Sequence, residues 1–328
     1  MAEPIFRIEH VSKGFGNHVV LDDLSLDIYA GEIIGVIGAS GAGKTTFLHT
    51  MIGFLKPDKG DVLFRQDHLL SYRESYIYRS VFKKQNIVKH VFGFASQIPS
   101  FYEELTTKEN LEYFGSLHNL SSDAIKTNTD TLLTLMDLKE ASDVKAKNLS
   151  GGMERRLDIA CALMHDPDVL ILDEPTADLD PLLRNHIWEL VRKINQKGTT
   201  IILSSHHLTE LESLCDRVAI IKEGKLIALG KPEELKKKFI LKQEIALQTV
   251  PGKYKEIADA LKKKHITDIE IKNNLIHIHT TSPEKTLSEV LATLSRRREK
   301  LAFIKVTSAS LDDVFISIWK KDKKEDEK

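Results

Sequence analysis

Short apolar runs alternate with amphipathic stretches along most of the chain. Buried strands are predicted by continuous apolar runs at 33–37, 169–172, 200–204 and 218–222. Alternating residues predict antiparallel strands at 5–11, 24–28 and 60–64. Helical periodicity covers 107–118, 121–137, 152–165 and 181–197. This order predicts an α/β fold with a mainly parallel sheet core, an antiparallel β subdomain and a helical subdomain inserted at about 100–165.

A second domain is indicated by a restart of the pattern after Pro232. Three strands are predicted at 244–249, 276–280 and 303–306, with helices near 253–264 and 284–297. We therefore expect an N-terminal domain at 1–232 and a small C-terminal α/β domain at 233–320. Residues 321–328 are all charged, and we expect them to form a disordered tail.

The composition argues against some partners. Lys and Arg number 47 and Asp and Glu number 48, so the net charge of −1 gives no global attraction to nucleic acid or to an anionic membrane. No apolar run approaches the roughly 18 residues of a membrane-spanning helix. Cys161 and Cys215 lie far apart within apolar helical patterns, as expected of reduced core residues. These features predict a cytoplasmic protein.

A glycine-rich loop lies between the predicted strand at 33–37 and a helix. Its glycines let the backbone fold around phosphate groups, and the N-terminus of the helix adds a positive partial charge. Lys44 can then reach the β- and γ-phosphates, and the Thr45 hydroxyl can bind Mg²⁺. The loop therefore predicts binding of a nucleoside triphosphate by Gly38, Ala39, Ser40, Gly41, Ala42, Gly43, Lys44, Thr45 and Thr46.

Two carboxylates follow the apolar strand at 169–172. Asp173 can hold Mg²⁺ directly or through water, and Glu174 can orient or deprotonate the water that attacks the γ-phosphate. A third segment, Leu149–Met153, places Ser150 as an N-cap and exposes backbone N–H groups of Gly151 and Gly152 at a helix N-terminus.

Together, in this order, these segments resemble the ATP-binding subunit of an ATP-binding-cassette (ABC) transporter across roughly residues 4–232. The resemblance implies the P-loop NTPase fold of an ABC cassette, with ATP and Mg²⁺ as ligands. It further implies that Phe15 stacks on adenine, that Gln97 is a catalytic residue and Mg²⁺ ligand, and that His206 is a catalytic switch. Asp180 matches the aspartate of the loop that follows the catalytic glutamate.

The chain departs from the family at three places. Met153 stands where glutamine is usual, and Asp178 stands where glycine is frequent. The segment Ser71–Lys89 is longer than usual. It contains four aromatic residues, Tyr72, Tyr76, Tyr78 and Phe82. They either form a hairpin or helix that faces a partner or pack on the protein's own sheet.

Two functional classes fit an ABC cassette. One is a transport ATPase that drives a separate membrane permease, and the other is a soluble ABC ATPase that acts on nucleic acid. A single cassette, no long heptad run and a neutral charge favour transport. The segment Ser308–Phe315 resembles the closing motif of ATPases that serve multidrug, sodium and polysaccharide or lipid exporters. An importer ATPase is the alternative.

The resemblance also implies partners. The permease would hold the subunit at the inner face of the cell membrane and dock near Phe101 and Tyr102. Two copies of the chain would form a head-to-tail dimer that encloses two ATP molecules. In it, Ser150, Gly151 and Gly152 of one copy would contact the γ-phosphate held by Lys44 of the other.

Overall fold

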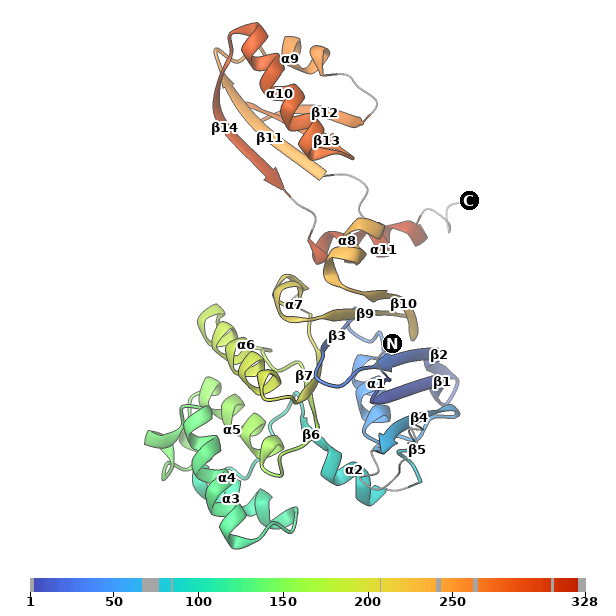
Figure 1. The fold of residues 1–328 in the computed structure, drawn as a ribbon, viewed down its shortest axis with the longest axis vertical. Helices are drawn as coiled ribbons and strands as arrows, with labels where there is room; N and C mark the ends of the chain where they lie inside the picture. Colours follow the sequence, from blue (N-terminus) through green and yellow to red (C-terminus); the bar gives the residue numbers. More distant parts are fainter. Residues whose placement is uncertain are drawn as a thin grey trace. The chain divides into compact units, whose positions relative to one another are not determined.

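The computed structural model describes residues 3–66, 77–83, 85–206, 208–239, 243–261, 265–307 and 310–323. The chain forms two compact units, Met1–Lys231 and Pro232–Lys328 (Figure 1). Each unit has its own sheets and its own apolar core. Within the described ranges, no helix is both long enough and apolar enough to cross a membrane.

The first unit is organised around a six-stranded sheet with the order β10-β9-β3-β8-β7-β6. From β9 to β6 the neighbours pair in parallel, whereas β10 is antiparallel to β9. Strands β3, β7 and β8 are buried along their whole length, which explains their continuous apolar sequences. The strands are β3 (Ile33–Ile37), β6 (Phe92–Ala95), β7 (Val169–Asp173), β8 (Thr200–Ser204), β9 (Arg217–Lys222) and β10 (Lys225–Gly230).

A four-stranded antiparallel sheet with the order β2-β1-β4-β5 completes the β structure of this unit. Its strands are β1 (Phe6–Phe15), β2 (His18–Ile28), β4 (Lys59–Gln66) and β5 (Ile77–Ser80). One apolar core includes residues of both sheets and of the first helix. The buried ring of Phe6 lies 5.1 Å from that of Phe64 and 5.0 Å from that of Phe92. The two sheets are therefore fixed against each other by packing.

Four helices of the first unit begin at residues whose side chains cap them. Thr106 and Glu109 form a capping box, and Ser121, Ser150 and Asp180 are N-caps with side-chain hydrogen bonds. Helices α3, α4 and α5 pack together as the inserted helical subdomain (Figure 1). The helices are α1 (Lys44–Met51), α2 (Gln85–Val91), α3 (Thr107–Leu117), α4 (Ser122–Leu135), α5 (Gly151–Leu163), α6 (Pro181–Gln196) and α7 (Leu208–Leu214).

The second unit contains a four-stranded antiparallel sheet with the order β12-β13-β11-β14. Helices α9 and α10 pack on it around Ile245, Leu247, Ile278 and Val290, and α8 packs against α11. The strands are β11 (Gln243–Val250), β12 (Ile266–Lys272), β13 (Leu275–Thr280) and β14 (Lys300–Thr307). The helices are α8 (Pro232–Phe239), α9 (Tyr254–Ala260), α10 (Pro283–Arg297) and α11 (Leu311–Lys323).

The predicted fold class is confirmed, with additions. The pattern missed β6, and it predicted three strands in the second unit, where β12 is a fourth. Helix α11 includes 321–323 of the predicted disordered tail, and residues 324–328 lie outside the described residues.

In the long segment Ser71–Lys89, the described aromatic residues pack on the protein itself. The Tyr78 hydroxyl donates to the Pro4 carbonyl, and Phe82 packs against the core. Tyr72 and Tyr76 lie outside the described residues.

A pair of stacked histidines joins α3 and α5 near β6. The rings of His118 and His165 are parallel within 5°, with centroids 3.7 Å apart. Nε2 of His165 lies 3.0 Å from the carbonyl oxygen of Phe92, and its buried Nδ1 has no hydrogen-bond partner among the described residues. The pKa of His165 is lowered to about 4, chiefly by burial and also by the nearby His118 and His90, while the contact with the Phe92 carbonyl opposes this shift. Protonation would therefore place an unpaired N–H in the interior.

We expect the protein to lose stability as the pH falls from about 6.5 toward 4. In this range the unfolded chain binds a proton at His165 whereas the folded chain does not, because the folded pKa is the lower one. His165→Gln, which cannot titrate, should lose less stability. Urea midpoints of both proteins at about pH 7.5 and pH 5 measure the difference. Equal losses in the two proteins would contradict this role of His165.

Candidate active site

The loop between β3 and α1 has a backbone that requires glycine. Gly41 and Gly43 have φ angles of 78° and 101°, in the left-handed region that other residues rarely adopt. A Cβ atom at Gly38 would lie 2.5 Å from the carbonyl oxygen of Ile221 in β9. The loop is thus pressed onto the sheet while it turns into α1. This arrangement places backbone N–H groups at the N-terminus of a helix, where anions bind.

Lys44 lies along this loop. Its Nζ donates to the carbonyl oxygens of Gly38 at 3.0 Å and Ala39 at 3.3 Å. The same nitrogen lies 3.7 Å from Oε1 of Glu174. The ammonium group is therefore held between the loop and a carboxylate. Only 11% of the Lys44 side chain is exposed.

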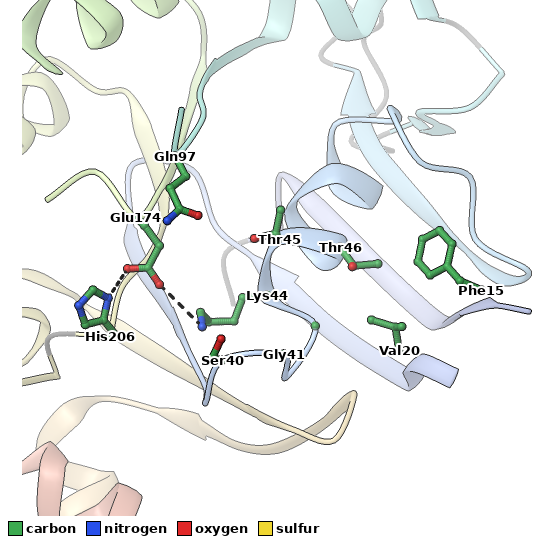
Figure 2. A pocket seen from close by; sticks show the side chains of 11 residues that line it. Phe15, Val20, Ser40, Gly41, Lys44, Thr45, Thr46, Gln97, Glu174 and His206 are labelled. Atoms are coloured by element: carbon green, nitrogen blue, oxygen red, sulfur yellow. Dashed lines mark hydrogen bonds and ion pairs between the residues drawn. The ribbon is translucent and has the colours of Figure 1, made fainter. Parts of the chain in front are cut away.

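The two carboxylates at the end of β7 have different surroundings. Asp173 is buried and accepts a hydrogen bond of 2.5 Å from the Ser204 hydroxyl, while the backbone N–H of Glu174 donates to the same hydroxyl at 2.9 Å. Glu174 has a φ of 50°, an unusual value for a residue other than glycine. Its Oε2 lies 2.7 Å from Nδ1 of His206. Figure 2 shows the carboxylate of Glu174 between His206 and Lys44.

A cavity of about 570 Å³ joins these groups, a size that suits a nucleotide-sized ligand. Gln97, just after β6, lies beside Glu174, and Phe15 is at the far side of the cavity (Figure 2). Asp173, the residue before Glu174, does not line the cavity. The lining residues are Phe15, Val20, Ser40, Gly41, Gly43, Lys44, Thr45, Thr46, Gln97, Glu174 and His206.

Of the other predicted site residues, Gly38, Ala39 and Ala42 belong to the glycine-rich loop but do not line this cavity, and Ser150–Gly152 and Asp180 do not line it either. Ser150 accepts a hydrogen bond from the backbone N–H of Met153 at the start of α5. Asp180 accepts from the N–H groups of Leu182 and Leu183 at the start of α6. A Cβ atom at Gly152 would lie 2.8 Å from the Leu183 side chain, so the two helix starts contact each other.

The chain is similar in sequence and in fold to known ABC proteins. The sequence profile of the ABC transporter family matches residues 21–177. A solved structure of the ATP-binding subunit of an ABC transporter has a TM-score of 0.62 and 27% identity, and covers 72% of this chain and 93% of that one. The linearmycin resistance ATP-binding protein of Bacillus subtilis (strain 168) is 30% identical across 96% of this chain and 98% of its own length. This chain belongs to the ABC transporter family.

A second relative is the Nod factor export ATP-binding protein I of Rhizobium sp. (strain N33). It is 30% identical over 97% of this chain and 98% of its own length. The ABC cassette predicted from the sequence is confirmed, as are ATP binding and ATP hydrolysis as the activity of the chain.

The structure gives a reason for one departure from the ABC pattern. Asp178 has a φ of 61°, so the backbone at this position adopts the left-handed conformation that glycine adopts freely. Aspartate tolerates this conformation better than most residues. The turn between β7 and α6 is thus kept in this ABC protein with a different residue.

Arg155 is a site residue that sequence reasoning missed. Its guanidinium donates to the carbonyl oxygens of Ser96 at 2.7 Å, Glu174 at 2.7 Å and Pro175 at 2.8 Å. It also lies 3.3 Å from Oδ2 of Asp158, and only 6% of Arg155 is exposed. One buried side chain of α5 therefore connects the residue before Gln97 with the end of β7.

Asp158 completes this connection. It accepts hydrogen bonds from the backbone N–H and the hydroxyl of Ser100, at 3.0 and 3.2 Å. Burial raises the pKa of Asp158, while these hydrogen bonds and the charge of Arg155 lower it. The only sequence signal was a pair of opposite charges three positions apart on a largely buried helix.

We expect Arg155→Met to destabilise the protein by about 3–5 kcal/mol, because it leaves a buried carboxylate without its cation and backbone carbonyls without donors. The double variant Arg155→Met/Asp158→Leu should lose less, since the buried charge is gone. Urea denaturation measures both. Arg192→Met is the control, because among the described residues the hydrogen bonds of Arg192 are two long contacts of 3.4 Å with Ser213. A loss of stability in Arg155→Met no larger than that in Arg192→Met would contradict this role of Arg155.

Proposed function

We propose that this chain is the ATP-hydrolysing subunit of an exporter, in which a separate membrane permease carries a drug, an ion, a lipid or a polysaccharide outward. Relatives named for linearmycin resistance and for Nod factor export support this direction, because they align over both units of the chain. The observation that carries the ATPase chemistry is the carboxylate of Glu174, held between Lys44 and His206 in the cavity beside the glycine-rich loop.

The cavity suits the triphosphate of ATP. We propose that the phosphates lie against Gly38–Thr46, where the backbone N–H groups at the start of α1 and the Lys44 ammonium offset their negative charge. Phe15 is exposed at the far side of the cavity, where adenine can stack on its ring. The predicted nucleotide-binding residues thus divide between a phosphate end and a base end.

The oxygen donors near Lys44 fit a magnesium ion. Among the described residues, no cluster of three His, Cys, Asp or Glu side chains could hold a metal by itself. Mg²⁺ in nucleotide sites takes few protein ligands and completes its shell with phosphate oxygens and water. We propose that Thr45, Gln97 and Asp173 supply the protein oxygens, directly or through water. The ion would neutralise charge that develops on the phosphates.

The catalytic step follows from the position of Glu174. We propose that its carboxylate accepts a proton from a water molecule while the water oxygen bonds to the γ-phosphorus and the bond to the β,γ-bridging oxygen breaks. His206 holds Oε2 of this carboxylate, and Gln97 lies beside it as a positioning group (Figure 2). Glu174 therefore acts as the general base, and His206 keeps it oriented.

The site of one chain is incomplete without a second copy. The N-cap Ser150 and the N–H groups of Gly151 and Gly152 form another anion-binding helix start, and they do not line the cavity of their own chain. We propose that two chains associate head to tail, so that this segment and Asp180 of one copy approach the γ-phosphate bound to the other. ATP then favours the closed dimer, because ADP lacks the γ-phosphate.

The permease needs an exposed apolar surface on this subunit. Just after Gln97, Ile98 is 80% exposed and Tyr102 is 49% exposed, and Tyr102 packs edge-on against Tyr113. Phe101 is only partly exposed. We propose that this surface, Ile98, Tyr102 and Tyr113, receives the permease and holds the subunit at the inner face of the membrane.

We expect Glu174→Gln to lower kcat by about 100-fold or more, because glutamine keeps the shape of the side chain but cannot accept the proton. ATP binding should remain. With ATP and Mg²⁺ the variant should elute as a dimer in size-exclusion chromatography with light scattering, and with ADP as a monomer.

Lys44→Ala/Glu174→Gln is the control for this dimer, and it should remain monomeric because it loses the cation at the phosphates. Phosphate release near the wild-type rate in Glu174→Gln would show that another group is the base. A Glu174→Gln protein that stays monomeric at high concentration, with and without its permease, would show that the proposed dimer is wrong.

We expect Tyr102→Ala/Tyr113→Ala to uncouple transport from hydrolysis, because the two exposed rings form part of the docking surface. The basal ATPase rate and the melting temperature of the isolated subunit should stay close to wild type. Permease binding is measured in pull-down and transport in vesicles. A fall in stability comparable to a core truncation, about 3–5 kcal/mol, would instead assign the rings to the helical subdomain.

A further inference from the structure

Phe15 lies at the tip of a hairpin, where a side chain is usually mobile. It is the last residue of β1 and pairs with His18 of β2 across a two-residue turn. Its ring is 52% exposed, and Lys13 Nζ lies over it at 5.6 Å from the centroid. A ring that must be ordered when a base binds costs conformational entropy at that moment.

Asp58, just before β4, holds the strand that ends at Phe15. Its Oδ1 accepts from Lys13 Nζ at 2.8 Å, and its Oδ2 accepts from the backbone N–H of Gly14 at 2.8 Å. Its own N–H donates to the carbonyl oxygen of Ser12 at 2.8 Å. One residue is thus bonded to three consecutive residues, in a stretch where the β1–β2 register is irregular.

The position of Asp58 is itself fixed by Gly60. This residue has a φ of 79°, and a Cβ atom there would lie 2.3 Å from the carbonyl oxygens of Glu9 and His10. No other residue type allows β4 to approach β1 so closely. The hydrogen bonds from Lys13 and Gly14 also hold the pKa of Asp58 below its ordinary value, so its carboxylate is charged near neutral pH.

Lys13 connects Asp58 to the ring. Its side chain is only 15% exposed and reaches Asp58, just before the neighbouring strand β4. A cation over one face of an aromatic ring is attracted to it and leaves the opposite face to a base. Neither Lys13 nor Asp58 lines the cavity, whereas Phe15 does, so the two residues reach the base end of the cavity through the Phe15 ring.

We infer that Asp58 and Lys13 are positioning residues for the nucleotide base: they hold the Phe15 ring in place before a purine stacks on it. This inference rests on the proposed stacking of adenine on Phe15. A ring that is already ordered binds the base at a lower entropic cost. The phosphate end of the site should not be affected by the two residues.

The test compares a ligand with a base and a ligand without one. ADP and pyrophosphate are titrated by calorimetry, since neither is turned over and neither carries a γ-phosphate that closes a dimer. Asp58→Ala should weaken ADP binding about 3- to 10-fold, the range of one or two hydrogen bonds, and leave pyrophosphate binding unchanged. Steady-state hydrolysis should show KM for ATP raised by a similar factor and kcat unchanged.

Asp22→Ala is the matched control. Asp22 is an exposed carboxylate of β2 in the same sheet, and it pairs with Lys225 at 3.2 Å. This variant should bind both ligands as the wild type does. Phe15→Ala should weaken the binding of ADP but not of pyrophosphate. The double variant Phe15→Ala/Asp58→Ala should bind ADP as weakly as Phe15→Ala does, and no more weakly.

The possible failures can be told apart. ADP binding unchanged in Phe15→Ala would show that the proposed base stacking is wrong. Weaker ADP binding by Phe15→Ala, together with unchanged ADP binding by Asp58→Ala, would overturn the positioning role alone. Equal losses of ADP and pyrophosphate in Asp58→Ala would also overturn it, because the effect would then lie at the phosphate loop.

Discussion

The parallel pairing of β3, β8, β7 and β6 is the constraint on which the site depends. In parallel strands all carboxyl ends lie at one edge of the sheet, so whatever follows each strand meets there. Lys44 follows β3, His206 follows β8, Glu174 follows β7 and Gln97 follows β6. Parallel pairing thus brings these four side chains to the same edge of the sheet, where the carboxylate of Glu174 lies between Lys44 and His206 (Figure 2). A different strand order would separate the carboxylate from the ammonium group without any change of local sequence.

Residues with a local signal were predictable, and residues whose role depends on distant backbone were not. The glycine-rich loop and the acidic pair after β7 follow directly from short segments of sequence. Strand β6 was missed because it has only four residues, whereas β12 was missed although its apolar and charged residues alternate as expected of an antiparallel strand. Arg155 was missed because its partners are carbonyl groups, which every residue has, brought together only by the fold.

Arg155 also shows how the strained glutamate is maintained. A residue other than glycine with positive φ carries a conformational cost that its surroundings must offset. At Glu174 the backbone N–H donates to Ser204 and the carbonyl accepts from Arg155, so both sides of the unusual dihedral are tied down. Since Arg155 belongs to α5 and also holds Ser96, a shift of the helical subdomain would move the segment before Gln97 and the glutamate together.

The register of β3 has a consequence for synthesis of the chain. Ile33 pairs with Ile201, and Ile34 pairs with Arg217, so the strand that leads into the phosphate loop is made early and its two neighbours are made late. At ribosomal rates of about 5–20 residues per second, roughly 8 to 37 s pass before these two neighbours are made. During that interval an apolar segment has no sheet to join. The apolar segment that later carries the site is therefore open to misassociation or chaperone binding until its neighbouring strands are made.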